Sequence, residues 1–160
     1  MNYRRRPTSR LRRFTKYSLI GAGITAALVT QLRFTYARGH SMEPSIHDGD
    51  LLISESFPFL ERRVGLESIV TFECPVPPGI EFVKRVRSLP GDPVFYAHRK
   101  TVVPADHYFV TGDNCEISVD SREFGPMRIR GRLLFLYCPH EHTLKFTPPS
   151  PEKNAHLPPK

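Results

Sequence analysis

Cysteine is scarce in this sequence, and its spacing does not match a metal site. The 160 residues include only three cysteines, Cys74, Cys115 and Cys138, with no C-x-x-C pair among them. His140 and His142 lie close to Cys138, but no second pair of ligands stands near them. We therefore interpret both histidines as solvated side chains and expect no structural zinc site.

The odd number of cysteines allows one disulfide and one free thiol if the domain is exported. Cys74 and Cys138 each precede a proline, so both are expected to end strands. A Cys74–Cys138 bridge is therefore a hypothesis that the sequence raises but does not settle.

Helical periodicity is nearly absent after Tyr36, and short apolar runs replace it. Turn-forming Gly, Pro and Asp residues separate these runs, which is typical of an antiparallel β-domain. The sixteen prolines suit turns and strand edges better than long helices. We therefore predict a mainly β fold, either an antiparallel sheet or a barrel-like domain. Its strands are expected at residues 50–54, 68–72, 81–86, 94–97, 107–112 and 131–137.

Acidic residues are missing from the first 16 positions, which hold seven of the 23 cations. The rest of the chain therefore has 23 − 7 = 16 cations against 16 acids and is neutral, although the whole chain carries a net charge of +7. A nucleic-acid-binding domain needs a basic patch on the fold itself. The charge distribution therefore argues against a nucleic-acid partner.

Charge is also absent from residues 17–32, YSLIGAGITAALVTQL. Sixteen residues are slightly fewer than the roughly 20 that span a bilayer, but Arg33 can snorkel and flanking aromatic residues suit the interfaces. The arginines before the segment predict a cytoplasmic N-terminus. Two alternatives are a cleaved signal peptide and a buried helix of a soluble protein.

These observations divide the chain into four segments. A basic cytoplasmic tail occupies residues 1–16, and one transmembrane anchor occupies residues 17–36. A β-rich domain follows at residues 37–146, on the far side of the membrane. Residues 147–160 are rich in proline and polar residues and are expected to be disordered.

Ser41 lies in GHSMEPSIHDGDLL, residues 39–52, behind a flexible Gly-His pair and ahead of Met-Glu-Pro. A serine becomes a nucleophile only with a base nearby, and none of the histidines shows a triad-like spacing. A buried lysine is a known alternative, because burial lowers its pKa. Lys84 is the only lysine in an apolar strand-like run, EFVKRV. The competing interpretation is a strand lysine facing solvent beside Arg85 and Arg87.

A polar stretch, TGDNCEISVDSREFGPM at residues 111–127, offers partners for a buried lysine. Ser118 and Ser121 could each present a hydroxyl, and Asp120 could form an ion pair with Arg122. The alternative is a solvated hairpin loop with ordinary Asx and Ser turns.

Three of these segments together resemble the type I signal peptidases, which use a Ser-Lys dyad. The segments are SMEPSI with HDGD at 41–50, VKRVRSLPGD at 83–92 and the stretch at 111–127, with a weaker match at 67–72. The resemblance implies Ser41 as nucleophile, Lys84 as general base and Ser118 as a hydrogen-bond partner of the lysine amine. Supporting and pocket residues follow in the same way: Gly112, Asp120 and Arg122 around the site, and Met42, Ile46, Leu52, Thr71 and Val83 lining pockets for small side chains.

The resemblance also implies how such an enzyme works and where. It removes signal peptides from exported preproteins at the outer side of the bacterial cytoplasmic membrane, in contact with membrane lipid and without metal or cofactor. The sequence departs from the family at Cys115, where arginine is common, and at Glu67-Ser68, where Gly-Asp is usual. Gly39 also replaces a serine that donates to the oxyanion in many relatives, which leaves the second oxyanion donor open.

Three other functions remain open from the sequence. One is a dedicated TraF-type peptidase that matures a pilin precursor, and another is a maturation protease for a single metalloenzyme. The third belongs to a different class, a non-catalytic β-module tethered to the membrane that binds a partner.

Overall fold

The computed structural model describes residues 17–18, 20–22, 31–56, 64–75 and 78–147. The chain divides into two compact units, residues 1–32 and residues 33–160. Residues 17–18 and 20–22 are helical, and in the described part of the chain no helix is both long and apolar enough to cross a membrane. The predicted basic tail, residues 19 and 23–30 of the predicted anchor, and residues 148–160 of the predicted C-terminal tail lie outside the described residues.

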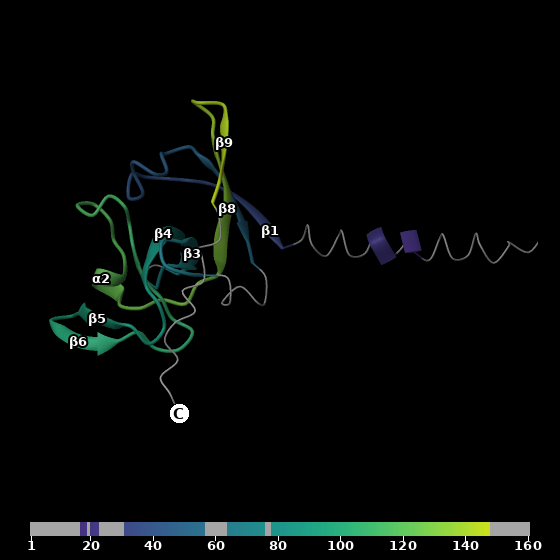
Figure 1. Ribbon diagram of the computed structural model, residues 1–160. Helices are drawn as coiled ribbons and strands as arrows, with labels where there is room; N and C mark the ends of the chain where they lie inside the picture. The colour runs from purple at the N-terminus through teal and green to yellow at the C-terminus, as the bar shows by residue number, and fades with distance from the viewer. Residues whose placement is uncertain (1–16, 19, 23–30, 57–63, 76–77, 148–160) are drawn as a thin grey trace, which may run out of the picture. The chain divides into compact units, whose positions relative to one another are not determined.

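The second unit is mainly β, as predicted (Figure 1). It contains one short helix, α2 (Ser121–Phe124), among the described residues. The strands are β1 (Leu32–Tyr36), β2 (Leu51–Glu55), β3 (Ile69–Glu73), β4 (Glu81–Ser88), β5 (Pro93–Tyr96), β6 (Arg99–Val102), β7 (Phe109–Thr111), β8 (Gly131–Cys138) and β9 (Thr143–Phe146).

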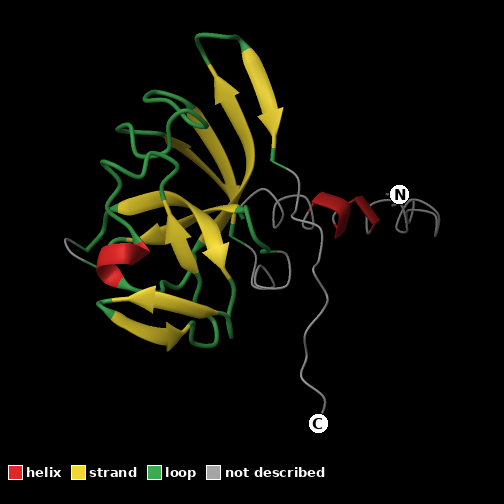
Figure 2. Cartoon of the chain, turned by 60° about the vertical axis from the view of Figure 1, so that its left-hand side comes forward, coloured by secondary structure: helices red, strands yellow, loops and turns green. Residues whose placement is uncertain are grey.

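Seven of these strands form one sheet in the order β1-β2-β8-β3-β4-β7, with β9 also paired to β8. The β2–β8, β8–β3, β3–β4 and β4–β7 pairs are all antiparallel. The path ends at β1 and β7, so hydrogen bonding among the described strands does not close it into a barrel. The β5–β6 hairpin forms a separate two-stranded sheet, and Figure 2 shows it beside α2.

All six strands expected from the apolar runs are present, with ends shifted by one or two residues. The strands that the sequence did not reveal are β1, β6 and β9. Nearly all of their residues are exposed, so they lack the apolar pattern that identifies a half-buried strand.

The end of the predicted anchor needs a correction, because Leu32–Tyr36 form strand β1. This strand pairs with β2 at the edge of the sheet, and Ala37 continues the contact. The Ala37 N–H donates to the Asp50 carbonyl at 2.8 Å, and the Gly49 N–H donates to the Ala37 carbonyl at 3.0 Å. Phe34 and Tyr36, two of the aromatic residues that suited a membrane interface, therefore belong to an edge strand.

Strand β3 separates two apolar clusters, because alternate residues of a strand point to opposite faces. Ile69 packs with Met42, Ile46, Leu52, Leu133, Leu136 and Cys138 on one face. Val70 and Phe72 pack with Val64, Val86, Tyr108 and Val110 on the other. Burial on both faces explains why this strand appears in the sequence as a continuous apolar run.

The predicted Cys74–Cys138 bridge is wrong. Cys138 is a free thiol whose Sγ donates to Asp50 Oδ2 at 3.7 Å. The antiparallel pairing of β3 with β8 sets Thr71 opposite Gly131. Cys74 and Cys138 therefore lie beyond opposite ends of this pairing, too far apart for a disulfide.

A buried ion pair joins two central strands of the sheet. Glu55 on β2 and Arg132 on β8 face each other in the register, and both are at least 96% buried. Glu55 Oε1 accepts from Arg132 Nε at 3.0 Å and from Nη2 at 2.7 Å. A buried charge that loses its partner is expensive, so the two residues depend on each other.

Replacing Arg132 alone should therefore destabilise the domain strongly. We expect Arg132→Met to lower the free energy of unfolding by about 3–5 kcal/mol, because it leaves the Glu55 carboxylate buried without a partner. Urea unfolding of the full chain in detergent measures this loss. Adding Glu55→Met should restore most of the stability, whereas an equal loss in the single and double variants would contradict this interpretation.

Candidate active site

Ser41 begins a tight turn that is anchored by its own neighbours. The Met42 carbonyl accepts the N–H groups of Ser45 at 2.9 Å and of Ile46 at 3.0 Å, and the side chains of Met42 and Ile46 are buried in the core. Before the turn, Gly39 has φ of +84° and donates its N–H to Asp48 Oδ1 at 2.7 Å. Ser41 is therefore held in a fixed position rather than carried on a free loop.

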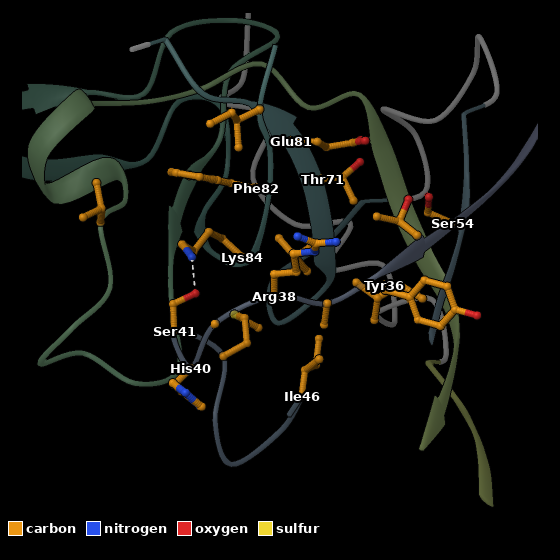
Figure 3. Close-up of a pocket in the computed structure, with 18 of the residues that line it drawn as sticks. Tyr36, Arg38, His40, Ser41, Ile46, Ser54, Thr71, Glu81, Phe82 and Lys84 are labelled. Carbon is orange, nitrogen blue, oxygen red and sulfur yellow. Dashed lines mark hydrogen bonds between the residues drawn. The ribbon is translucent and has the colours of Figure 1, made fainter. Parts of the chain in front are cut away.

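The Lys84 side chain extends from β4 to this serine, and Figure 3 shows the two side chains facing each other. Lys84 Nζ donates to Ser41 Oγ at 2.6 Å, although 43 residues separate them in the sequence. Only 3% of Lys84 is exposed, and its amine lies 5.3 Å from the centre of the Phe82 ring. The alternative of a solvent-facing strand lysine does not fit this burial.

Burial lowers the pKa of Lys84 from its ordinary value of 10.5 to about 8. The nearby carboxylates of Asp120 and Asp113 raise the pKa and oppose this effect, while the Arg122 guanidinium adds to the lowering. A substantial fraction of the amine is therefore neutral near pH 8, and only a neutral amine can accept a proton.

Ser118 lies at the site, but its hydroxyl is directed to another partner than the sequence suggested. Ser118 Oγ donates to Asp120 Oδ2 at 2.7 Å and accepts from the Gly112 N–H at 3.2 Å. A hydroxyl can donate only one hydrogen bond, and here Ser118 donates it to the Asp120 carboxylate. Among the described hydrogen bonds none joins Ser118 to Lys84, and in this structure the hydroxyl is bonded to Asp120 and Gly112 instead.

Asp120 and Arg122 form the ion pair that the sequence suggested for this loop. Arg122 donates from Nε to Asp120 Oδ1 and from Nη2 to Oδ2, both at 2.9 Å. Asp120 is fully buried and caps the N-terminus of α2 by accepting the Arg122 N–H. Burial alone would raise the pKa of Asp120, but the hydrogen bonds from Arg122, Gly112 and Ser118 outweigh it, so the pKa is lowered.

Gly112 is required by space rather than by backbone freedom. A Cβ atom at this position would lie 2.2 Å from Ser118 Oγ and 2.4 Å from the Ser41 carbonyl oxygen. The neighbouring chain comes this close because the Asn114 N–H donates to the same Ser41 carbonyl at 3.1 Å. Glycine therefore lets the third segment pack directly against the nucleophile turn.

A second ion pair at the site was missed in the sequence. Arg85 donates from Nε to Asp113 Oδ1 at 2.8 Å and from Nη2 to Oδ2 at 2.6 Å. Its Nη2 also donates to Ser45 Oγ at 3.1 Å, which ties β4 to the turn that carries Ser41. In the sequence, Arg85 supported only the competing interpretation of a strand that faces solvent. Its position directly after Lys84 was a signal, because it places Arg85 on the opposite face of β4.

Arg87 extends this network to the surface. It donates from Nη1 to both carboxylate oxygens of Glu67, at 2.6 and 2.8 Å, and from Nη2 to Asp113 Oδ1 at 3.3 Å. Burial alone would raise the pKa of Asp113, but hydrogen bonds from Arg85 and Ser45 and the charge of Arg87 outweigh it and lower the pKa. Asp113 is therefore ionised at neutral pH and joins three segments of the site.

The Ser41–Lys84 pair opens onto a cavity of about 630 Å³. The five residues predicted to line substrate pockets all line it: Met42, Ile46, Leu52, Thr71 and Val83. Ser54 and Glu81 also line it, so the wall is not entirely apolar. In the described part of the chain, no cluster of three or more His, Cys, Asp or Glu side chains could hold a metal ion.

Comparison with known proteins gives consistent matches along most of the chain. The model of the family described as "Signal peptidase, peptidase S26" matches residues 11–102 and 96–133. Mitochondrial inner membrane protease subunit 1 of Xenopus tropicalis is 31% identical over 138 residues, which are 77% of this chain and 83% of that protein. The ATP-independent subunit 1b of Arabidopsis thaliana is 33% identical over 118 residues, 66% of this chain and 70% of that protein. Subunit 2 of the Saccharomyces cerevisiae protease is 26% identical over 131 residues, 72% of this chain and 74% of that protein.

Adding a single methyl group at Gly112 should disturb the site. Gly112→Ala would push its Cβ against Ser118 Oγ and the Ser41 carbonyl, and a displacement of about 1 Å at a catalytic pair can lower the rate about 100-fold. We expect kcat/KM for a cleavable peptide to fall by about that factor. The double variant Gly112→Ala/Ser118→Ala should not recover activity, because the clash with the Ser41 carbonyl remains. Full activity of Gly112→Ala would contradict the close packing.

Proposed function

This chain belongs to the S26 signal peptidase family, and from that premise we propose that it is a membrane-anchored serine endopeptidase that removes signal peptides from preproteins. Ser41 is the nucleophile in this proposal and Lys84 is the general base. The observation that carries the proposal is the 2.6 Å contact between Lys84 Nζ and Ser41 Oγ, made by a lysine that is almost completely buried.

The reaction begins with proton transfer from Ser41 to the neutral amine of Lys84. When the Lys84 amine is neutral, the hydrogen bond between the two side chains reverses its direction, and the Ser41 hydroxyl donates to the amine before the proton is transferred. Ser41 Oγ attacks the carbonyl carbon of the scissile peptide bond, and the Lys84 ammonium then gives its proton to the departing amine. Water hydrolyses the resulting acyl-enzyme, with Lys84 again accepting a proton.

The negative charge that forms on the carbonyl oxygen needs hydrogen-bond donors. The Ser41 N–H is one candidate, because it makes no hydrogen bond among the described residues. Gly39 has no side chain to act as a second donor, and its own N–H is already bonded to Asp48. The proposal therefore relies on the Ser41 N–H as the first donor.

Two arginine–carboxylate pairs support the chemistry by fixing the segments around it. Arg85 and Asp113 connect β4 to the nucleophile turn, and Arg122 and Asp120 hold the loop that carries Ser118. None of these four side chains needs to exchange a proton during the reaction.

The substrate and its location follow from the cavity and from the relatives. A cavity walled by Met42, Ile46, Leu52 and Val83 suits the small side chains that precede the cut in a signal peptide. The relatives described above are, by name, proteases of the mitochondrial inner membrane. For this chain we propose an anchor N-terminal to β1 and a catalytic domain on the outer side of a bacterial cytoplasmic membrane.

The first test is cleavage of a preprotein that carries an Ala-x-Ala leader, by the full chain in detergent. We expect wild-type protein to cut after the second alanine and Ser41→Ala to lose at least about 1,000-fold in kcat, because the nucleophile is missing. Mass spectrometry of the products locates the cut. Cleavage of a pilin precursor but not of general leaders would favour a dedicated peptidase. If neither wild type nor Ser41→Ala cleaves any precursor, a binding module is favoured.

The activity should rise with pH as Lys84 loses its proton. Because the pKa of Lys84 is lowered to about 8, kcat/KM should increase about tenfold per pH unit well below pH 8 and level off above pH 9. Peptide cleavage under conditions where chemistry limits the rate gives the profile. A rate that does not change between pH 6 and pH 9 would exclude this base.

Lys84→Met is the matched variant for that measurement. It should abolish turnover at every pH, because the apolar stem remains but the amine is gone. It should also be at least as stable as the wild type at pH 7. A lowered pKa means that the unfolded chain binds more protons between about pH 8 and 10.5, so the wild type gains stability only as pH rises through that range. Thermal unfolding at pH 7 and pH 10 checks this sign.

A further inference from the structure

Arg38 lines the cavity and has no carboxylate partner among the described residues. Most arginines in the described part of the chain form ion pairs with Asp or Glu: Arg33, Arg85, Arg87, Arg122, Arg128, Arg130 and Arg132. Arg38 and Arg99 are the two described arginines that no such ion pair includes. Arg38 lines the cavity, whereas Arg99 lies on the β5–β6 hairpin and does not line it. The positive charge of Arg38 is therefore uncompensated at the place where a peptide is expected to bind.

Arg38 leaves its segment on the side away from the apolar core. Its neighbour Ala37 packs against the core cluster that includes Met42, Ile46 and Leu52, hereafter the apolar wall. Neighbouring residues in an extended chain point to opposite sides, so Arg38 starts on the other side. Arg38 is exposed, and Figure 3 shows its guanidinium directed toward the cavity. Its charge is therefore accessible to a bound ligand.

The cavity lies between two runs of the chain that both have free strand edges. Residues 35–42 and residues 79–84 line it, and the Lys84–Ser41 contact joins the two runs. β4 pairs with β7 only from Arg85 onward, so residues 81–84 have a free edge opposite β3. β1 ends the path of strands, so its outer edge is also free among the described strands. An extended peptide between these edges can form backbone hydrogen bonds to them.

The alternation of side chains along such a peptide selects one residue for Arg38. The small side chains one and three residues before the cut are those that we place against the apolar wall. The residue between them then points to the opposite side, which is the side on which Arg38 leaves its segment. Glu81 also lines the cavity, but it shares a face of β4 with Val83, which packs against the apolar wall. The Glu81 carboxylate is therefore on the other side of the peptide from Arg38.

A second cation at the cavity is already compensated. His40 also lines the cavity, and its Nδ1 lies 2.8 Å from Glu43 Oε1. The hydrogen bond to Glu43 and the charge of that carboxylate raise the pKa of His40. A protonated His40 is thus balanced by its own neighbour, which leaves the charge of Arg38 available to the substrate.

We propose that Arg38 gives the enzyme a preference for an acidic side chain, aspartate or glutamate, two residues before the cut. This inference rests on the proposed peptidase function for the identity of its ligand. It adds selection by charge at the position between the two small side chains, which the apolar wall does not contact. A carboxylate there forms a charge-assisted hydrogen bond with the guanidinium, whereas the isosteric amide of glutamine brings no charge.

Affinity for leader peptides tests this preference independently of turnover. Peptides with Ala-Glu-Ala or Ala-Gln-Ala before the cut are bound to the full-length Ser41→Ala protein in uncharged detergent and followed by fluorescence anisotropy. We expect about fivefold tighter binding of the glutamate peptide at low salt, the upper range for an exposed ion pair. The ratio should approach one in about 1 M salt, which screens such pairs. In the Ser41→Ala/Arg38→Gln protein it should be about one at both salt concentrations.

Reversing the charge gives a sharper test with a matched control. The Ser41→Ala/Arg38→Glu protein should bind an Ala-Lys-Ala peptide more tightly than the Ala-Glu-Ala peptide. Ser41→Ala/Arg99→Glu changes the net charge equally at the other unpaired arginine and should keep the preference for glutamate. A reversal in both proteins would assign the effect to net charge and overturn the proposal. Glutamate moved to the first residue after the cut should show no dependence on Arg38, and a dependence there would overturn the assignment to this position.

The outcomes also separate this inference from the proposed function. Cleavage of the Ala-x-Ala preprotein by wild type, with equal binding of the glutamate and glutamine peptides, would overturn the role of Arg38 alone. A preference that depends on Arg38, without cleavage by wild type, would support the role of Arg38 and contradict the peptidase. Absence of both would overturn both.

Discussion

The site depends on the burial of one amine, that of Lys84, against the hydroxyl of Ser41. The amine must lose its charge to act as a base, and burial in the sheet is the main cause of its lowered pKa. That burial requires β4 to lie inside the sheet, with β3 on one side and β7 on the other. The order of the strands is therefore a condition for the chemistry.

Two carboxylates near Lys84, those of Asp120 and Asp113, oppose the lowering of its pKa. Each of them is paired with an arginine, which limits this opposing effect. An unpaired carboxylate would stabilise the ammonium and return the pKa toward its ordinary value. Asp120 is paired with Arg122, and Asp113 with Arg85, each through two hydrogen bonds. Each arginine compensates much of the carboxylate charge while its geometry holds a loop in place. The same ion pairs thus serve both the position of the site and the basicity of its lysine.

The sequence predicted the parts of this site that follow from residue type and missed those that follow from geometry. A lone lysine in an apolar run and a serine in a Gly-His-Ser-Met turn were local candidates that the family resemblance selected, and six strands had clear apolar runs. Arg85 and Asp113 could not be paired, because their contact depends on which strands are neighbours. The Cys74–Cys138 hypothesis failed for the same reason, since only the antiparallel register shows that these residues lie at opposite ends. The edge strand β1 is mostly exposed and carries no apolar signal.

Two glycines show how an absent side chain permits close packing around the site. At Gly112 the space is already occupied by Ser118 and the Ser41 carbonyl. At Gly131 it is occupied by Thr71 Oγ1 and the Glu55 carbonyl, which lie 2.9 and 3.0 Å from the place of a Cβ atom. Glycine therefore lets the segment after β7 pack against the nucleophile turn, and it lets β8 pack against β3 and the end of β2. Close packing at both places fixes the reacting atoms and the strands that position them.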